Sequence, residues 1–471
     1  MRNRLAAVGV AALIFLCGIA TAQDSEQRTA RYFESIRKQP SLLLAFLRKV
    51  PKGGDLHNHL DGAIYAEDLI DFAADGGFCV DRTSSRLIAP PCDDSCASYT
   101  AKPAARCAFG DQVLYNQMID SWSMRNWNPG NESGHDHFFA TFDKFGLAAH
   151  THVADAIATS TNQAGLDHLQ YVEYMHTADG GAAAELAAKV EWSSDFSKMR
   201  EALLGAGMKD VAAQTSKTLD ADDARAREIM KCGTPQATPG CGVTVRYLYQ
   251  VLRGLPPNVV FAQILLGFEL ASIDPRVVGL NLVMAEDWYV PIHDFALHMS
   301  MLDYLHGLYP KVHIALHAGE LAMGLVPPED LTFHIRASVE RGHAERIGHG
   351  VDVMNETNPI GLLREMAERN VLVEICLSSN DLILGVSGDD HPLPIYLKYG
   401  VPVALATDDE GVNRSDMTHE FLRAAEGYHI SYPDLKRMAR QSLEHSFLPG
   451  QSLWKATKIS FQPVTQCAGS V

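Results

Sequence analysis

The chain has 471 residues, 46% of them hydrophobic, and a formal net charge of −17 at pH 7. Such a negative charge argues against a protein that binds nucleic acid or anionic membranes through a basic surface. The length suits either two domains or one α/β barrel with insertions.

Residues 1–22 have the three parts of a secretory signal peptide. A basic start (MRNR) precedes an apolar run (LAAVGVAALIFLCGIA), and the small residues ATA at 20–22 form a cleavage site. We predict cleavage after Ala22 and a mature protein that is secreted or periplasmic. No later stretch is long and apolar enough to span a bilayer. Residues 23–50 are expected to form an N-terminal helical segment.

Eight short apolar runs follow, each ending in polar or ionisable residues, with helical patterns such as 291–308 and 359–370 between the later ones. The runs are GGDLHNHL (53–60), LQYVEYMH (169–176), VTVRYLYQV (243–251), VVGLNLVMAED (277–287), VHIALHAGE (312–320), RIGHG (346–350), VLVEICLSSN (371–380) and PVALATDDEG (402–411). Runs this apolar indicate parallel strands covered by helices. Eight of them predict an α/β fold of the (β/α)8 TIM barrel type, whose sites lie at the C-terminal strand ends.

We expect the barrel to occupy residues 51–445. Helical insertions of about 76–145 and 178–242 follow the first and second strands, on the face where the active site of a barrel lies. Both are candidate lids or walls of that site. Residues 446–471 are predicted to be a C-terminal surface extension.

The cysteines fit an oxidising compartment. Cys232 and Cys241 bracket the turn-rich GTPQATPG and predict a local disulfide. Four more, in a polar, proline-containing segment, predict two bridges with three possible pairings; they are Cys79, Cys92, Cys96 and Cys107. Cys376 lies in an apolar strand and is predicted to be a buried free thiol, and Cys467 has no evident partner.

Ionisable residues gather at the strand ends: His57, His59, His317, Glu320, His349, Asp408 and Asp409. Residues two apart on a strand share a face, so the first two histidines point to one place. Separate burial of seven such groups would carry seven desolvation costs. One shared site is the better explanation.

Three neutral histidines and a carboxylate suit one divalent ion such as Zn²⁺, with an open position for water. The ion would activate that water. Glu320 lies close enough to protonate a substrate, and His349 to take or orient the proton of the water. Binuclear barrel hydrolases often carry a carboxylated lysine on the fourth strand, and none stands there in this chain. We therefore expect one ion per chain.

The motifs HNHLDGA, HAGE, RIGHG and TDDEG, in this order, resemble those of the adenosine deaminase family of metal-dependent amidohydrolases. The resemblance runs from about residue 51 to about 425. The export signal, the insertions and HDHFFATFDKF (135–145) are most similar to its secreted, growth-factor-type branch, in which a homodimer is plausible. The resemblance implies a TIM barrel that hydrolyses adenosine or 2′-deoxyadenosine to inosine or 2′-deoxyinosine and ammonia.

The resemblance also implies a role for each motif residue. The implied zinc ligands are His57, His59, His317 and Asp408. Glu320 matches the acid that protonates purine N1, and His349 matches the histidine that serves the attacking water.

The implied substrate-binding residues are Asp61, Gly62, Met284 and Asp409. Asp409 matches the acid near N7, and Asp61 matches the acid at the ribose 5′ region. A carboxylate there suits a hydroxyl and repels a phosphate, which favours a nucleoside over a nucleotide. The alternative is that Asp61 only caps the loop.

Two departures from the family pattern bear on the substrate. Met284 stands where a glycine is common, and Glu410 follows the acid pair where proline is frequent. One alternative is therefore an amidohydrolase that deaminates another aminated purine or ring. A second, of another class, is an exported nucleoside-binding protein with little turnover, but the intact Glu320 and His349 argue against it.

The remaining candidates have plainer interpretations. His135 and His137 lack strand context and are not expected to bind the metal. Trp122, Met124 and Trp127 would form either an apolar purine lid or ordinary packing. The acid-rich DADDARAREIM (220–230) is expected to be a solvated helix.

Overall fold

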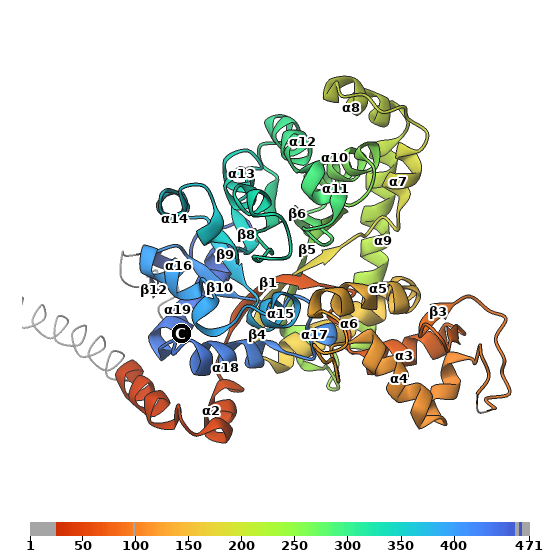
Figure 1. Ribbon diagram of the computed structural model, residues 1–471, viewed down its shortest axis with the longest axis horizontal. Helices are drawn as coiled ribbons and strands as arrows, with labels where there is room; N and C mark the ends of the chain where they lie inside the picture. The colour runs from red at the N-terminus through yellow and green to blue at the C-terminus, as the bar shows by residue number, and fades with distance from the viewer. Residues whose placement is uncertain (1–24, 98, 457–460, 464–471) are drawn as a thin grey trace, which may run out of the picture.

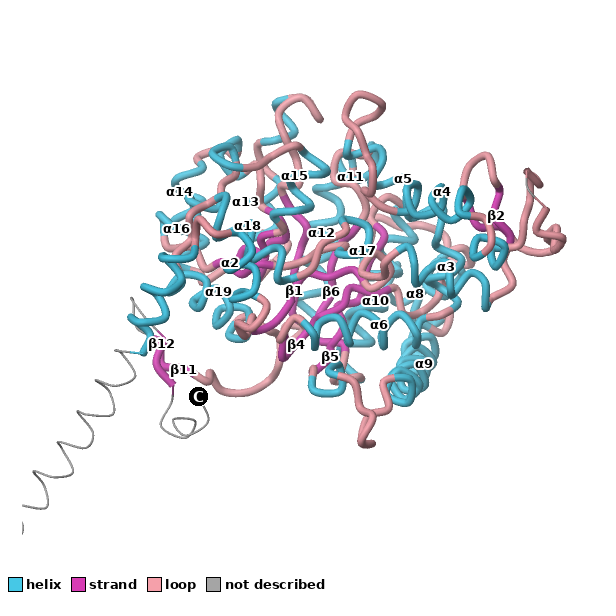
Figure 2. Tube along the Cα trace, turned by 90° about the horizontal axis from the view of Figure 1, so that it is seen from below, coloured by secondary structure: helices cyan, strands magenta, loops and turns pink. Residues whose placement is uncertain are grey.

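A computed structural model describes residues 25–97, 99–456 and 461–463. The predicted signal peptide and Cys467 lie outside the described residues. Eight parallel strands form one sheet in the order β1-β4-β5-β6-β7-β8-β9-β10, with helices around it (Figures 1 and 2). A parallel bridge between Asn58 and Asp408 joins the last strand to the first. The predicted (β/α)8 barrel is confirmed.

Each barrel strand overlaps one of the eight predicted runs. The strands are β1 (Gly53–His59), β4 (Leu169–His176), β5 (Thr244–Leu252), β6 (Val277–Val283), β7 (His313–Ala318), β8 (Arg346–His349), β9 (Leu372–Ile375) and β10 (Val403–Leu405). All seven residues of β6 are buried. Helices outside and side chains within the barrel cover both faces of such a strand, which explains its unbroken apolar pattern.

Helices surround the strands and build the insertions. The α-helices are α2 (Pro40–Leu47), α3 (Ala66–Asp75), α4 (Gln112–Trp122), α5 (Gly134–Thr151), α6 (Val153–Leu166), α7 (Ala182–Ala187), α8 (Phe196–Gly205), α9 (Met208–Ile229), α10 (Pro257–Ile273), α11 (Tyr289–His293), α12 (Phe295–Leu308), α13 (His334–Glu340), α14 (Pro359–Glu368), α15 (Leu377–Leu384), α16 (Leu393–Tyr399), α17 (Glu410–Asn413), α18 (Met417–Gly427) and α19 (Tyr432–Glu444). Short 3-10 helices are η1 (Ala105–Phe109), η2 (Pro239–Gly242), η3 (Pro328–Leu331), η4 (Val353–Asn355) and η5 (Gly388–Asp390).

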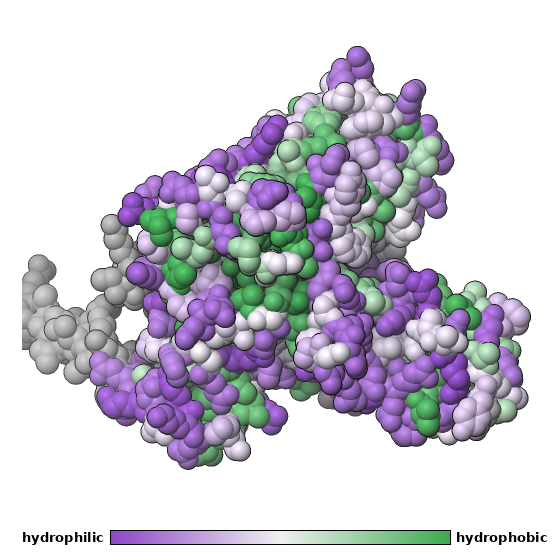
Figure 3. All heavy atoms as spheres, viewed as in Figure 1, coloured by the Kyte–Doolittle hydropathy of each residue, from purple (hydrophilic) through white to green (hydrophobic). Residues whose placement is uncertain are grey.

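Helix α10 shows how deeply some of these helices are buried. Its residues 260–270 are buried all round, because β5 and β6 lie on one side and α7, α9 and α12 on the others. A helix that is apolar on every face belongs in such a place. Polar side chains (purple) cover much of the face in view in Figure 3, and apolar ones (green) gather near its centre. Among the residues described, no helix has the length and apolar character needed to cross a membrane.

The segment between β1 and β4 is not purely helical. Besides α3 to α6 it contains an antiparallel hairpin, β2 (Cys79–Asp81) and β3 (Arg86–Ile88). Disulfides Cys79–Cys92 and Cys96–Cys107 tie this region together, which selects one of the three pairings left open by the sequence. The predicted Cys232–Cys241 bridge and the buried free thiol of Cys376 are confirmed.

The segment between β4 and β5 contains α7, α8 and α9. Helix α9 packs against α6 and α10 and lies at the side of the barrel (Figure 1). It includes the acid-rich segment 220–230, which is helical to Ile229 and mostly exposed, as predicted. One face of the helix, with Asp222 from that segment, also lines the cavity described below. Near the C-terminus, strands β11 (Trp454–Ala456) and β12 (Phe461–Pro463) form a small hairpin.

Candidate metal centre and active site

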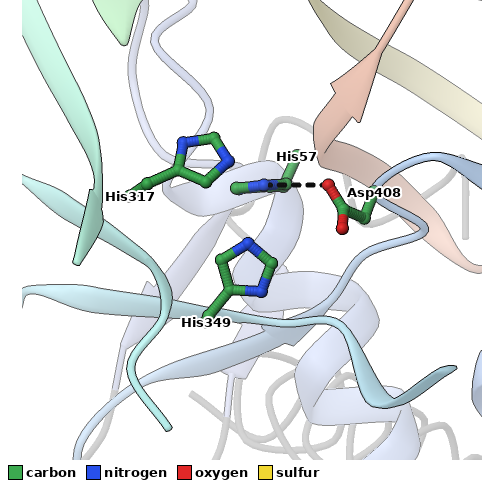
Figure 4. Close-up of side chains that lie close together, drawn as sticks. All are labelled: His57, His317, His349 and Asp408. Carbon is green, nitrogen blue, oxygen red and sulfur yellow. Dashed lines mark ion pairs between the residues drawn. The ribbon is translucent and has the colours of Figure 1, made fainter. Parts of the chain in front are cut away.

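Donor side chains from four strands converge at the C-terminal end of the barrel (Figure 4). Nitrogen or oxygen atoms of His57, His317, His349 and Asp408 all lie within 4.8 Å of one another. His59 joins them, because its Nε2 is 3.2 Å from Nε2 of His317 and 3.4 Å from Oδ1 of Asp408. The structure thus brings together the histidines and the aspartate that the sequence places at one site.

The spacing of these donors fits a divalent ion. Nε2 of His57 and Nε2 of His59 each lie 3.4 Å from Asp408 Oδ1. Ligands about 2.0–2.1 Å from a tetrahedral ion stand roughly 3.3 Å from each other. Nε2 of His57 is buried and has no hydrogen-bond partner among the described residues. The donor set therefore has the spacing that a small cation requires.

Hydrogen bonds on the far ring nitrogen orient three of the histidines in the same way. Nδ1 of His57, His59 and His317 each lies within 2.9 Å of a side-chain oxygen. The three acceptors are Glu374, Gln250 and Asn281, in that order. An Nδ1–H that donates leaves the lone pair on Nε2, where the donors meet.

His349 is held in the opposite tautomer. The backbone N–H of Leu393 donates to Nδ1 of His391 at 3.1 Å, so Nε2 of that ring carries its hydrogen and donates to Oδ1 of Asn380 at 3.1 Å. The Asn380 amide then donates to Nδ1 of His349 at 3.0 Å, which leaves the hydrogen of His349 on Nε2. Burial lowers the pKa of His349 to about 3, so the ring is neutral. His349 therefore presents a hydrogen-bond donor to the site.

Glu320 follows β7 and is buried beside this donor, with Oε1 3.7 Å from Nε2 of His349. Burial, followed by the nearby carboxylates of Asp408 and Glu286, raises the pKa of Glu320 well above its ordinary value. A raised pKa favours the protonated form of this carboxyl group. A neutral carboxylic acid at this place can give that proton to a substrate.

Glu286 fixes the backbone of Glu320, and the sequence analysis missed it. Its two oxygens accept the backbone N–H groups of Gly319 at 3.1 Å and Glu320 at 2.8 Å. Burial opposes its ionisation, but His334, Arg253 and these N–H groups lower its pKa to about 2. The signal was available, since Glu286 ends the fourth apolar run just as the other site residues end theirs.

We expect Glu286→Gln to lower kcat about tenfold to a hundredfold, because an amide accepts through only one oxygen and a small displacement of a reacting group is costly. Glu329→Gln, at an exposed acid in η3, is the matched control. Steady-state ammonia release from adenosine, the reaction that the family resemblance implies, gives the comparison, together with the metal content and the unfolding midpoint of both variants. A Glu286→Gln enzyme within twofold of the parent kcat would show that this carboxylate does not position the site.

Asp409 and Gly62 are packed against each other. Asp409 is buried, and a Cβ atom at position 62 would lie 1.6 Å from its Oδ1. Only glycine leaves the space that this carboxylate occupies. Burial, followed by the charge of Asp408, raises the pKa of Asp409 well above its ordinary value.

Asp61 pairs with a residue that the sequence pattern did not suggest. Its Oδ2 is 2.9 Å from Nε2 of His150, in α5. Burial opposes ionisation of Asp61, but the bond to His150 makes its pKa lower than usual. No sequence pattern joins these two residues, because 89 positions separate them.

Met284 follows β6 with a φ of +83°, a backbone conformation that glycine adopts readily. Its carbonyl oxygen accepts two bonds from the buried guanidinium of Arg253, at 3.1 and 3.0 Å. Its sulfur accepts the N–H of Gly254 at 3.3 Å. These contacts hold a methionine where the backbone favours a glycine.

These residues line one cavity of about 1000 Å³. Its wall includes His59, Asp61, Met284, His317, Glu320, Asp408 and Asp409, together with residues of α5, α9 and the 177–182 loop. Phe139 and Trp288 form part of an aromatic wall, with ring centroids 5.9 Å apart. The volume is at the top of the range, about 300–1,000 Å³, that small-molecule sites occupy.

Other candidates stay outside this cavity. Glu410 is buried in α17 but does not line it, so this departure does not shape the wall directly. Trp122 is buried and donates its indole N–H to the carbonyl of Ser85, and neither Met124 nor Trp127 lines the cavity. His135 pairs with Asp287. The lid interpretation of the tryptophans is therefore wrong, and packing is correct.

Histidine and carboxylate donors at the strand ends make this a (β/α)8 barrel with a candidate metal site. The model of the family described as "Adenosine deaminase" matches residues 211–456, just over half of the chain. The chain belongs to the adenosine deaminase family.

Relatives agree with this assignment. An adenosine deaminase of Clostridium perfringens (strain 13 / Type A) is 33% identical over 135 residues, which cover 28% of this chain and 37% of the relative. One from Escherichia coli (strain SMS-3-5 / SECEC) is 36% identical over 140 residues, 30% of this chain and 39% of the relative. The chain thus spans less than two fifths of these relatives' length.

Solved structures share the fold. An adenine deaminase from Arthrobacter aurescens superposes with a TM-score of 0.55 and 18% identity over 84% of this chain and 94% of its own. An N6-methyl-AMP deaminase from Arabidopsis thaliana superposes with a TM-score of 0.54 and 19% identity. The match covers 86% of this chain and 94% of that structure. An amidohydrolase from Burkhoderia ambifaria with bound zinc superposes with a TM-score of 0.50 and 15% identity. The match covers 86% of this chain and 88% of that structure.

Proposed function

We propose that the protein is a zinc-dependent purine nucleoside deaminase, which hydrolyses adenosine or 2′-deoxyadenosine to inosine or 2′-deoxyinosine and ammonia. One observation carries the proposal. Three histidines offer an Nε2 lone pair to a common point, while His349 offers an N–H and Glu320 a proton at the edge of that point. A site that only bound a nucleoside would need no proton donor beside its metal.

His57, His59, His317 and Asp408 are proposed to hold one Zn²⁺ per chain. When bound, the ion would supply Lewis acidity that lowers the pKa of water at its open position. The proposed ligand set contains no cysteine thiolate. Its relative affinity for different metal ions therefore depends on imidazole and carboxylate ligands.

The remaining residues are proposed to act on the purine. Water adds its oxygen to C6, Glu320 gives its proton to N1, and the ring accepts the electron pair of the broken C=N bond. The Nε2–H of His349 donates to the added oxygen. Asp409 hydrogen-bonds the purine near N7. The ionised Glu320 takes one proton from the added water and passes it to the amino group, which leaves as ammonia. Glu320 then takes the remaining hydroxyl proton as the C6 carbonyl of the product forms, so it is protonated again.

The cavity favours a nucleoside. None of its lining residues is lysine or arginine, and Asp61, which is paired with His150, is one of them. The carboxylate of Asp61 would repel a 5′-phosphate, and no lysine or arginine of the lining would hold it. An N6-substituted purine is the second candidate substrate, because Met284 and the aromatic wall place apolar surface in the cavity.

Export is part of the proposal. Residues 1–22 have the composition of a signal peptide, and three disulfides suit an oxidising compartment. Assembly as a homodimer, by analogy with the secreted branch of the family, completes the proposal.

The test is ammonia release from adenosine by purified mature protein. We expect release with zinc, none after dialysis against a chelator, and recovery when zinc is returned. An N6-methyladenosine reaction run in parallel separates the two candidate substrates. A folded, zinc-loaded protein that binds adenosine but releases no ammonia from either compound would overturn the proposal and favour a binding protein.

A further inference from the structure

The cavity continues beyond the space that a nucleoside at the metal centre would fill. In a purine, C6 and the sugar-bearing N9 lie on opposite sides of the ring system. A substrate whose C6 lies at the donors therefore points its sugar outward, toward Asp61. The lining of the same cavity also includes residues of α9 and the 177–182 loop, and we name the part that they line the outer chamber.

One face of α9 forms the long wall of the outer chamber. Asp210, Gln214, Thr218 and Asp222 all line the cavity and stand four residues apart. Residues at this spacing lie on one face of a helix, and this stripe runs for about 18 Å. The wall thus carries hydroxyl, amide and carboxylate groups over more than the length of a sugar.

His176 is a buried polar group without a partner in this chamber. It ends β4, lines the cavity and is 8% exposed. Within the described part of the chain, its ring forms no hydrogen bond. Burial lowers its pKa, so the neutral ring offers one donor and one acceptor. A ligand hydroxyl or amine that reached His176 would find a ring nitrogen free to form a hydrogen bond.

Carboxylates outnumber cationic groups in the lining of the cavity. Asp61 is paired with His150 and Asp143 with Arg86, and Asp179 accepts the hydroxyl of Tyr249. No ion pair joins Asp210 or Asp222 to another described residue. Both therefore present negative charge to whatever enters.

We propose that the outer chamber is a subsite for an uncharged or cationic group carried on the 5′ carbon of the sugar. Preferred substrates would then be adenine nucleosides with a 5′ extension that ends in a hydroxyl or an amine. The inference rests on the proposed function for the direction in which the nucleoside lies. C5′ is the sugar position from which an exocyclic chain extends away from the base, so it leads along the stripe of α9.

The test uses three 5′-thioethers of 5′-deoxyadenosine with chains of matched length, ending in a primary amine, a hydroxyl or a carboxylate. We expect kcat/KM to fall in that order, with about tenfold between amine and carboxylate at low salt and less at high salt. Equal kcat/KM for the three would overturn the proposal. Values for all three below a hundredth of that for adenosine would overturn it as well.

A double variant tests whether α9 causes the difference in kcat/KM between the amine and the carboxylate. Asp210→Asn with Asp222→Asn should bring the amine-to-carboxylate ratio close to one and leave adenosine turnover within twofold of the parent. Asp75→Asn with Asp389→Asn, at exposed acids elsewhere, is the matched control and should leave the ratio unchanged. A ratio that survives the α9 double variant would contradict the assignment of the subsite to this helix.

Binding measurements distinguish a failure of the proposed function from a failure of the proposed subsite. If adenosine itself is not deaminated, calorimetric Kd values of the three thioethers for the zinc-loaded protein still rank the end groups. Tighter binding of the amine than of the carboxylate supports the subsite without turnover. Equal Kd values would overturn it.

Discussion

Replacing Glu320 by glutamine is expected to lower kcat for adenosine by about a thousandfold, in the range that general acid catalysis contributes. Glutamine keeps the shape and can form a hydrogen bond to N1, but it has no proton to transfer. The backbone bonds from Gly319 and Glu320 to Glu286 do not involve the changed group, so the loop should stay in place. Steady-state ammonia release by the purified variant measures the loss.

Two further measurements assign that loss to the proton. Zinc content and the Kd for inosine should stay within a few fold of the parent, since the donors and the cavity wall are unchanged. Glu345→Gln, at an exposed acid next to the start of β8, is the control and should be fully active. A Glu320→Gln enzyme that keeps a tenth or more of kcat would show that another group protonates the purine.

The barrel could be predicted from the sequence because parallel strands buried on both faces are short and apolar throughout. All eight overlap the predicted runs, and β4 matches its run from Leu169 to His176. The donors could be predicted for a related reason. Strand ends in a barrel meet at one face, so residues such as His57 and His317 converge although they are 260 positions apart.

The outer part of the site could not be predicted in this way. His150 and Asp222 come from helices of the inserted segments, whose packing on the barrel leaves no periodic signal. The β2–β3 hairpin was missed because strands of three residues in a polar, cystine-rich segment show no alternation. The tautomer of His349 depends on His391 and Asn380, which only the fold brings into contact.

Changing Asn380 to aspartate is expected to reverse the tautomer of His349 and lower kcat by about a hundredfold to a thousandfold, the cost of losing a donor to a developing oxyanion. An ionised carboxylate only accepts hydrogen bonds, so Nδ1 of His349 would have to carry the hydrogen. The lone pair on Nε2 would then face the metal centre. His391, whose Nδ1 accepts from Leu393, still donates to the new side chain and keeps it in place.

The order of two variants distinguishes a change of tautomer from simple damage. Asn380→Ala leaves His349 free to adopt either tautomer, so it should lose less activity than Asn380→Asp although it removes more of the side chain. With cobalt in place of zinc, only the aspartate variant should change the visible spectrum, since His349 becomes a competing ligand. Asn370→Asp, at an exposed asparagine after α14, should behave like the parent. A greater loss in Asn380→Ala than in Asn380→Asp would mean that Asn380 serves packing, and that the proton on His349 is set by something else.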